Sequence, residues 1–193
     1  LWDRTKREPM PAALRDALAS DMPVVIHQSF FDRTVMRESK LFTLTPERII
    51  DTMVQAYCHG LPGGLDKLCA LFGIKGKMKE GRALIHLFCK PNSKGGYNDY
   101  RSHPAKWAEF CEYAKQDIRA MQELYKRLPR WNYPGVNFPA QPSAEHRMWV
   151  LDQRINDRGF AVDVELATAA VGLSASEKAW LNERTAPMRM PAA

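Results

Sequence analysis

The stretch VVIHQSFFDRTVM, residues 24–36, constrains the fold of this chain more than any other. It opens with Val24, Val25 and Ile26, a β-branched run that is typical of a strand buried on both faces of a mostly parallel sheet. A helix is predicted directly afterwards, opening at Asp32. Open α/β folds bind ligands beyond the carboxyl ends of such strands. Asp32 is therefore either a site residue or the acid that caps its own helix.

The residues before this strand cannot supply the neighbours that a buried parallel strand needs. They predict one short helix, which has Pro11 in its first turn and ends near Ser20. The chain therefore reads as if it started in the middle of an α/β fold.

Composition narrows the class of protein. The chain is 45% hydrophobic and 26% charged, as expected of a soluble globular protein. No apolar run approaches the roughly 20 residues of a membrane span, and the first ten residues lack the apolar core of a signal peptide. Four cysteines form no CxxC pair and fall in helical apolar patterns, so we predict reduced core residues, no zinc and a cytoplasmic location: Cys58, Cys69, Cys89 and Cys111.

Positive charge is concentrated between residues 66 and 101. Eight Lys and Arg residues and three Asp and Glu residues in this segment give an excess of +5, against +6 for the whole chain. Such a concentration suggests a polyanionic partner, with Lys75, Lys77 and Lys79 as candidate phosphate contacts. The alternative is a solvated, lysine-rich loop without a function.

The stretch HPAKWAEFCEYAKQDIRAMQELYKRLP predicts one long amphipathic helix, because its apolar residues recur at three- and four-residue spacing. Tyr113 and Asp117 are four residues apart in it, so they lie one turn apart at the edge of the apolar stripe. They form either a routine surface pair or part of a site.

Taken together, HQSFFDRTVM and YAKQD resemble the second and third motifs of the DEDD-type 3′→5′ exonucleases, in the subgroup whose last motif is Tyr-x-x-x-Asp. Four longer phrases are similar to the proofreading exonuclease of phage and prophage family A DNA polymerases: IIDTMVQAYCHGLPGGLDKLC, ALIHLFCKP, YKRLPRWNY and LDQRINDRGFAVD. The resemblance covers about residues 1–170. In that family the last phrase opens the polymerase module.

This resemblance implies a truncated ribonuclease H-like α/β exonuclease fold, mostly helical in the part present, over residues 1–130. A linker rich in proline and aromatic residues is expected at 131–143. The helical start of the polymerase module is expected at 144–193, with a disordered tail.

The resemblance also implies a chemistry. Asp32 and Asp117 would be two of four ligands of a two-metal site for Mg²⁺ or Mn²⁺, and Tyr113 would orient the attacking water. Gln28 and Phe31 would lie near the unstacked 3′-terminal nucleotides of single-stranded DNA, where aromatic stacking tolerates any base.

Two departures from the family pattern qualify this prediction. The family usually has Asn where Gln28 stands, and its first motif, Asp-x-Glu on the first strand, is absent. Because half of the expected metal ligands are missing, we predict that this polypeptide alone is inactive. The predicted function is the proofreading exonuclease of a replicative DNA polymerase. The alternatives are a catalytically dead, nucleic-acid-binding prophage remnant and a DEDD-type exonuclease acting on RNA. The sequence leaves the oligomeric state open.

Overall fold

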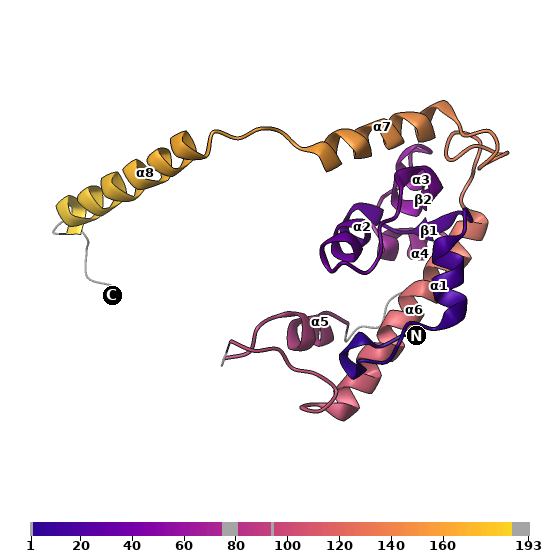
Figure 1. The fold of residues 1–193 in the computed structure, drawn as a ribbon, viewed down its shortest axis with the longest axis horizontal. Helices are drawn as coiled ribbons and strands as arrows, with labels where there is room; N and C mark the ends of the chain where they lie inside the picture. The colour runs from indigo at the N-terminus through magenta and orange to yellow at the C-terminus, as the bar shows by residue number, and fades with distance from the viewer. Residues whose placement is uncertain (1, 75–80, 94, 187–193) are drawn as a thin grey trace. The chain divides into compact units, whose positions relative to one another are not determined.

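A computed structural model describes residues 2–74, 81–93 and 95–186 of the chain (Figure 1). The chain divides into two compact units, Leu1–Arg154 and Ile155–Ala193. Two predictions fall outside the described residues, namely the phosphate contacts at Lys75, Lys77 and Lys79 and the disordered tail at 187–193.

The first unit is built around two short parallel strands. After a 3₁₀ turn, η1 (Arg4–Lys6), and the predicted short helix α1 (Ala12–Ala19), β1 (Val24–Ile26) leads into α2 (Ser29–Glu38). A second 3₁₀ turn, η2 (Pro46–Arg48), precedes β2 (Ile49–Asp51). The register places Val24 opposite Ile49 and Ile26 opposite Asp51. Among the described residues the sheet has these two strands alone, so one edge of β1 carries no strand.

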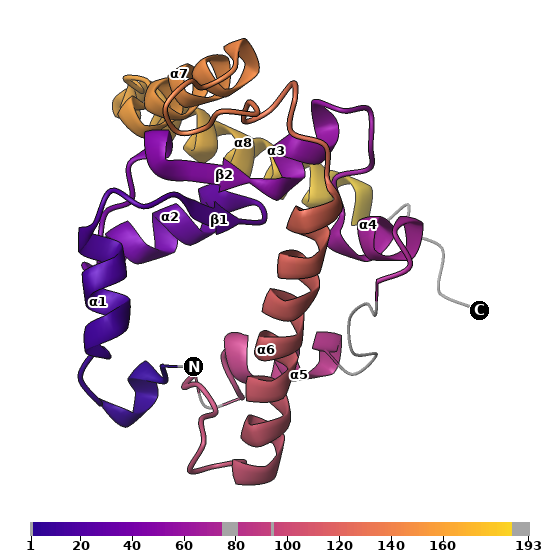
Figure 2. The ribbon, with the colours of Figure 1, turned by 90° about the vertical axis from the view of Figure 1, so that its right-hand side faces the viewer.

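Helices make up the rest of this unit: α3 (Thr52–Tyr57), α4 (Leu65–Leu71), α5 (Gly81–Cys89) and α6 (Pro104–Arg127). The long α6 confirms the helix predicted from apolar periodicity. Figure 2 shows α5 beside the N-terminal half of α6, and α3 and α4 near its C-terminal end. Helix α6 therefore spans the unit and contributes side chains to two separate apolar clusters, one with α3 and α4 and one with α5.

The predicted linker and the start of α7 (Ala144–Arg158) belong to the core of the first unit. Tyr133 is fully buried, and its ring lies 5.3 Å from that of His146 and 6.1 Å from that of Trp149. Its hydroxyl accepts a hydrogen bond of 3.1 Å from the backbone N–H of Asp51. On α7, Nε2 of His146 lies 3.0 Å from the carbonyl oxygen of Ile49. Residues beyond 130 thus hold β2 in place.

The second unit contains α8 (Val164–Thr185), which lies within residues 144–193, where the sequence predicted helical structure. Its N-cap is Asp163, whose carboxylate accepts the N–H of Leu166 at 2.9 Å. No residue of α8 is buried. In the described part of the chain, no helix is long and apolar enough to cross a membrane.

One cysteine prediction is wrong. All four cysteines are free, but their burial differs: Cys69 is buried, Cys58 and Cys111 are half-buried, and Cys89 is exposed. Cys89 follows the buried Phe88 on α5, and one further residue turns its side chain by about 100° to the solvent side of the helix.

Candidate active site

The helix that carries Asp32 begins three residues earlier than predicted. Helix α2 starts at Ser29, and Gln28 occupies the N-cap position with a left-handed φ of 62°. Asp32 lies in the first turn but does not cap the helix, so the interpretation of Asp32 as a cap is wrong. A left-handed backbone is disfavoured for most side chains and is best tolerated by Gly and Asn. Gln28 therefore holds a backbone conformation that Asn, the residue expected here from the resemblance, would adopt more readily.

Asp51, at the end of β2, fixes this turn. Its carboxylate accepts the backbone N–H of Gln28 at 3.1 Å, and the N–H and hydroxyl of Ser29 at 2.7 Å each. It also caps α3, accepting the N–H groups of Met53 and Val54 at 2.9 and 3.3 Å. Asp51 is 2% exposed. One buried carboxylate therefore joins the ends of both strands to the starts of both following helices.

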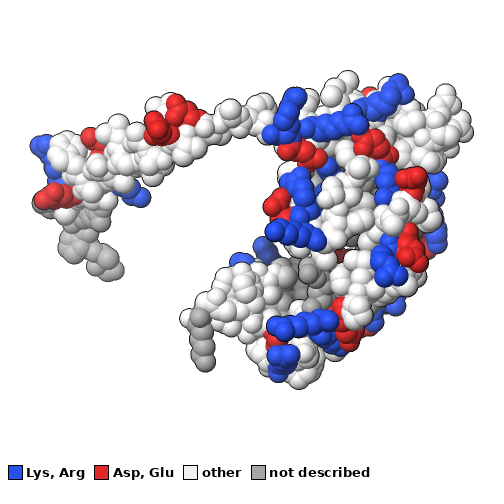
Figure 3. Space-filling view, viewed as in Figure 1, with Lys and Arg blue, Asp and Glu red and all other residues white. Residues whose placement is uncertain are grey.

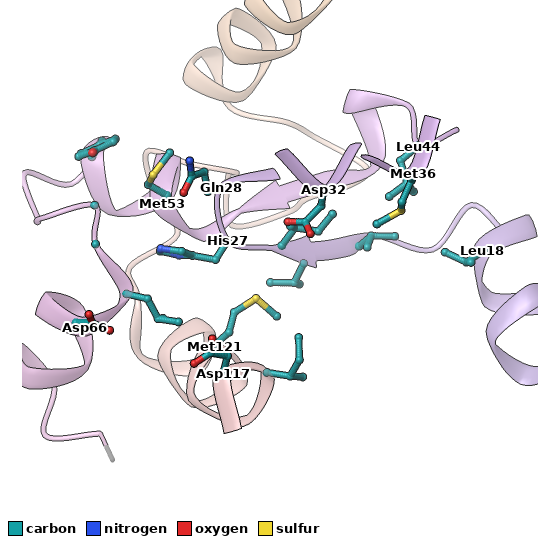
Figure 4. A pocket seen from close by; sticks show the side chains of 18 of the residues that line it. Leu18, His27, Gln28, Asp32, Met36, Leu44, Met53, Asp66, Asp117 and Met121 are labelled. Carbon is teal, nitrogen blue, oxygen red and sulfur yellow. The ribbon is translucent and has the colours of Figure 1, made fainter. Parts of the chain in front are cut away.

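A pocket of about 750 Å³ runs along β1, between this strand and α6, and is lined by Gln28, Asp32 and Asp117 (Figure 4). Asp32 comes from the side of β1 and α2, and Asp117 comes from α6. Most of the remaining wall is apolar, and it includes Leu14, Leu18, Val24, Val25, Ile26, Met36, Leu44, Ile118 and Met121. The fold thus brings two acids that are 85 residues apart in the sequence to one largely apolar pocket.

The pocket perturbs Asp32. Burial, and secondly the negative charge of Asp51, raise the pKa of the Asp32 carboxyl above its ordinary value. Both causes penalise the ionised form. The folded protein therefore binds the Asp32 proton more tightly than the unfolded chain does, so Asp32 contributes stability at low pH that is lost as the pH rises through its folded-state pKa.

Replacing Asp32 with Asn should therefore stabilise the protein at neutral pH. The gain should shrink towards zero as the pH falls below about 4, where the carboxyl is protonated in both states. Urea unfolding at pH 4 and pH 7 measures this difference, and Asp16→Asn on the exposed face of α1 is the matched control. A gain that is equal at both pH values would show that the ionised Asp32 carries no penalty.

Tyr113 is hydrogen-bonded to Asp117 but is not itself part of the pocket wall. The Tyr113 side chain is 8% exposed, so Tyr113 and Asp117 do not form a surface pair. The ring stacks on Phe110, with centroids 6.2 Å apart and planes 10° apart. Burial, and then a hydrogen bond with the Asp117 carboxylate, raise the pKa of Tyr113 to about 12. The phenol therefore stays protonated at neutral pH and donates a hydrogen bond to the carboxylate.

The second oxygen of this carboxylate is more unusual. Oδ1 of Asp117 is buried, and no donor among the described residues reaches it. A buried acceptor without a partner carries a desolvation cost of about 1–3 kcal/mol, and more when it is charged. Such a cost is expected where the group binds something other than protein.

Other predicted site residues lie outside the pocket wall or outside the described residues. Phe31 is 64% exposed and lies outside the pocket wall, and the lysines at 75, 77 and 79 are not described. Within the described residues, no three His, Cys, Asp or Glu side chains cluster as a metal site. Sequence reasoning also missed His27 and Asp66, which line the pocket, and the role of Asp51 beyond capping α3.

Comparison with known proteins decides the family. Residues 3–130 match the family model described as "3′-5′ exonuclease", the model for this domain in family A DNA polymerases. The chain belongs to this exonuclease family. Exonuclease domains of this kind act on DNA and generally use divalent metal ions.

A curated relative extends the match beyond the exonuclease domain. The DNA polymerase of Bacillus phage SP02 is 30% identical over 187 residues, which cover 93% of this chain. The chain spans 28% of the length of that relative. No solved structure gives a significant match to the exonuclease chain.

Proposed function

We propose that the pocket of Asp32 and Asp117 is part of the site at which this exonuclease domain hydrolyses the 3′-terminal phosphodiester of single-stranded DNA. In the proposal, the domain proofreads for a replicative DNA polymerase of phage or prophage type. The main support is that Asp117, whose buried Oδ1 has no donor among the described residues, lines the same pocket as Asp32.

The acids present are chemically suited to divalent ions. Carboxylate oxygens are the hard ligands that Mg²⁺ and Mn²⁺ prefer, and the open acceptor on Asp117 and the raised pKa of Asp32 are both features that a bound cation would relieve. Asp32 and Asp117 are therefore the residues that would hold metal. When bound, two such ions supply an activated water and charge relief on the leaving oxygen.

The other residues have positioning roles in this proposal. Tyr113 donates a hydrogen bond to Asp117, which supports a role in orienting that carboxylate and, in the proposal, the attacking water. Gln28 lies in the pocket wall, and the exposed Phe31 follows in the first turn of α2. An exposed aromatic ring beside the site suits stacking on unpaired bases of any sequence.

We further propose that two more carboxylates complete the site, carried by a strand that pairs with the open edge of β1. That edge carries no strand in the described residues, and apolar side chains such as Val25, Met36 and Met121 line the pocket beside it. A strand with an Asp-x-Glu pattern would cover these side chains and add the missing acids. The 193-residue polypeptide alone is then expected to be inactive.

Manganese binding tests the assignment independently of turnover. The polypeptide should bind Mn²⁺ weakly by electron paramagnetic resonance, and Asp32→Asn with Asp117→Asn should lower the affinity about tenfold or more, since even outer-shell changes cost 10–100-fold. Asp16→Asn with Asp163→Asn removes the same charge elsewhere and should leave binding unchanged.

Two results would contradict the proposal. The first is Mn²⁺ binding that survives loss of both Asp32 and Asp117. The second is release of mononucleotides from 3′-labelled single-stranded DNA by the unmodified polypeptide, if that activity persists in Asp32→Ala.

A further inference from the structure

A row of basic side chains runs along α5 and ends just after it, and within the described residues its Arg and Lys members have no acidic partner. Arg82, His86 and Lys90 follow one another at four-residue spacing, and all three are exposed. They line one shallow groove of about 710 Å³. Because four residues rise about 6 Å along a helix, Arg82 and His86 lie about 6 Å apart along α5, and Lys90 follows its last residue.

This row differs from the charges elsewhere on the first unit. On the face shown in Figure 3, Lys and Arg are interspersed with Asp and Glu. On α6, for example, Lys106 pairs with Glu109 and Lys126 pairs with Glu123, each at 2.7 Å. Within the described parts of the chain, neither Arg82 nor Lys90 has a carboxylate partner, and no acid lines their groove.

The loop after α5 forms the other wall of the groove, and side-chain hydrogen bonds stabilise it. Nδ2 of Asn98 donates to the carbonyl oxygen of Leu87 at 3.0 Å, which ties the loop after α5 to the helix. Oδ1 of Asn92 accepts the N–H of Gly96 at 3.1 Å. Both asparagines line the groove, so amide groups and cations face the same space.

Packing connects this row to the candidate active site. The first residue of α5, Gly81, lies so close to the Tyr113 ring that a Cβ there would come within 2.4 Å of Cε2. Farther along α5, Leu84 and Phe88 share a core cluster with Tyr113. Arg82 therefore starts the row one residue from the Tyr113 contact, and Lys90 ends it directly after the last residue of α5.

We propose that this groove binds the phosphate backbone of single-stranded DNA upstream of the 3′ end that enters the pocket. Arg82 suits bidentate phosphate binding, whereas Lys90 acts as a point charge and His86 adds a ring donor. Such contacts position the strand without reading bases. The inference rests on the proposed function, because it assigns the path of the DNA leading to that site.

Salt-dependent binding of fluorescent oligo-dT, measured by anisotropy in EDTA, tests this groove without metal or turnover. Arg82→Ala with Lys90→Ala should flatten the slope of log K against log salt by about 1.4, at about 0.7 per phosphate. Raising the salt from about 50 to about 200 mM should then weaken the variant about sevenfold less than the unmodified chain. Oligo-dA should show the same change.

The matched control is Lys126→Ala with Lys178→Ala, which removes two exposed cations from α6 and α8 and should keep the original slope. Circular dichroism checks that both variants fold. The inference is overturned if the groove variant keeps the original slope, if the control flattens it equally, or if polyglutamate of equal charge displaces the DNA as well as unlabelled oligo-dT does. Because the anisotropy is measured without metal, Mn²⁺ binding that survives Asp32→Asn with Asp117→Asn, together with a flattened slope in the groove variant, would refute the proposed site alone.

Discussion

A chain that ends at Arg130 should lose its cooperative unfolding transition, whereas a chain that ends at Arg158 should keep it. The family match stops at residue 130, but the core around the two strands includes Tyr133 and Trp149, which are 0% and 9% exposed. Truncating a buried aromatic side chain to Ala costs about 3–5 kcal/mol. Losing both would cost about 6–10 kcal/mol, which is comparable to the whole stability of a typical domain.

Urea unfolding followed by circular dichroism compares the two truncated chains with the full polypeptide. Tyr133→Phe is the graded control, since it keeps the ring and removes only the hydrogen bond to the Asp51 backbone, at a cost of about 1–3 kcal/mol. If the chain ending at Arg130 unfolded at the same urea concentration as the full chain, the packing of residues 131–154 would contribute nothing to this unit.

Local periodicity was enough to predict several elements. Apolar residues at three- and four-residue spacing predicted α6. The β-branched run at Val24 predicted β1, and its partner proved to be downstream, at Ile49. These predictions depend on intrinsic preferences within about two turns of chain, which the sequence displays directly.

Features set by tertiary contacts were beyond the same reasoning. Helix α2 starts at Ser29 because a carboxylate 22 residues away accepts its N–H, and no local pattern predicts that contact. Residues 131–143 have the composition of a linker, yet Tyr133 within them is buried against α7. The close approach of Gly81 to Tyr113 likewise depends on how α5 packs on α6.

The candidate site likewise contains residues that the sequence singled out and contacts that only the fold reveals. Resemblance to a family singled out Asp32, Tyr113 and Asp117, and the fold places the two acids in one pocket. The sequence assigned Asp51 only to the capping of α3. Its contacts with Gln28 and Ser29 depend on the pairing of β1 with β2, which sets Ile26 opposite Asp51.

Replacing Asp51 with Ala should cost about 3–5 kcal/mol of unfolding free energy. The buried carboxylate accepts five hydrogen bonds, from Gln28, Ser29, Met53 and Val54. Hydrogen bonds to a charged group contribute about 1.5–3 kcal/mol each and a helix cap about 1 kcal/mol, but bonds that share one acceptor are not additive. Asp51→Asn keeps one acceptor oxygen and should lose less stability.

The Asp51→Asn variant also separates an effect of Asp51 on the Asp32 carboxyl from an effect on stability alone. Asp51 lies outside the pocket wall, but its charge is the second cause of the raised pKa of Asp32. In Asp51→Asn, the pKa of the Asp32 carboxyl, followed by ¹³C NMR, should therefore move down towards its ordinary value. Asp16→Asn on α1 should leave it unchanged. If Asp51→Asn shifted the unfolding midpoint but not the pKa of Asp32, Asp51 would brace the two helices without tuning the acid. If Asp51→Ala left stability intact, the five contacts would not be what holds α2 and Asp32 in place.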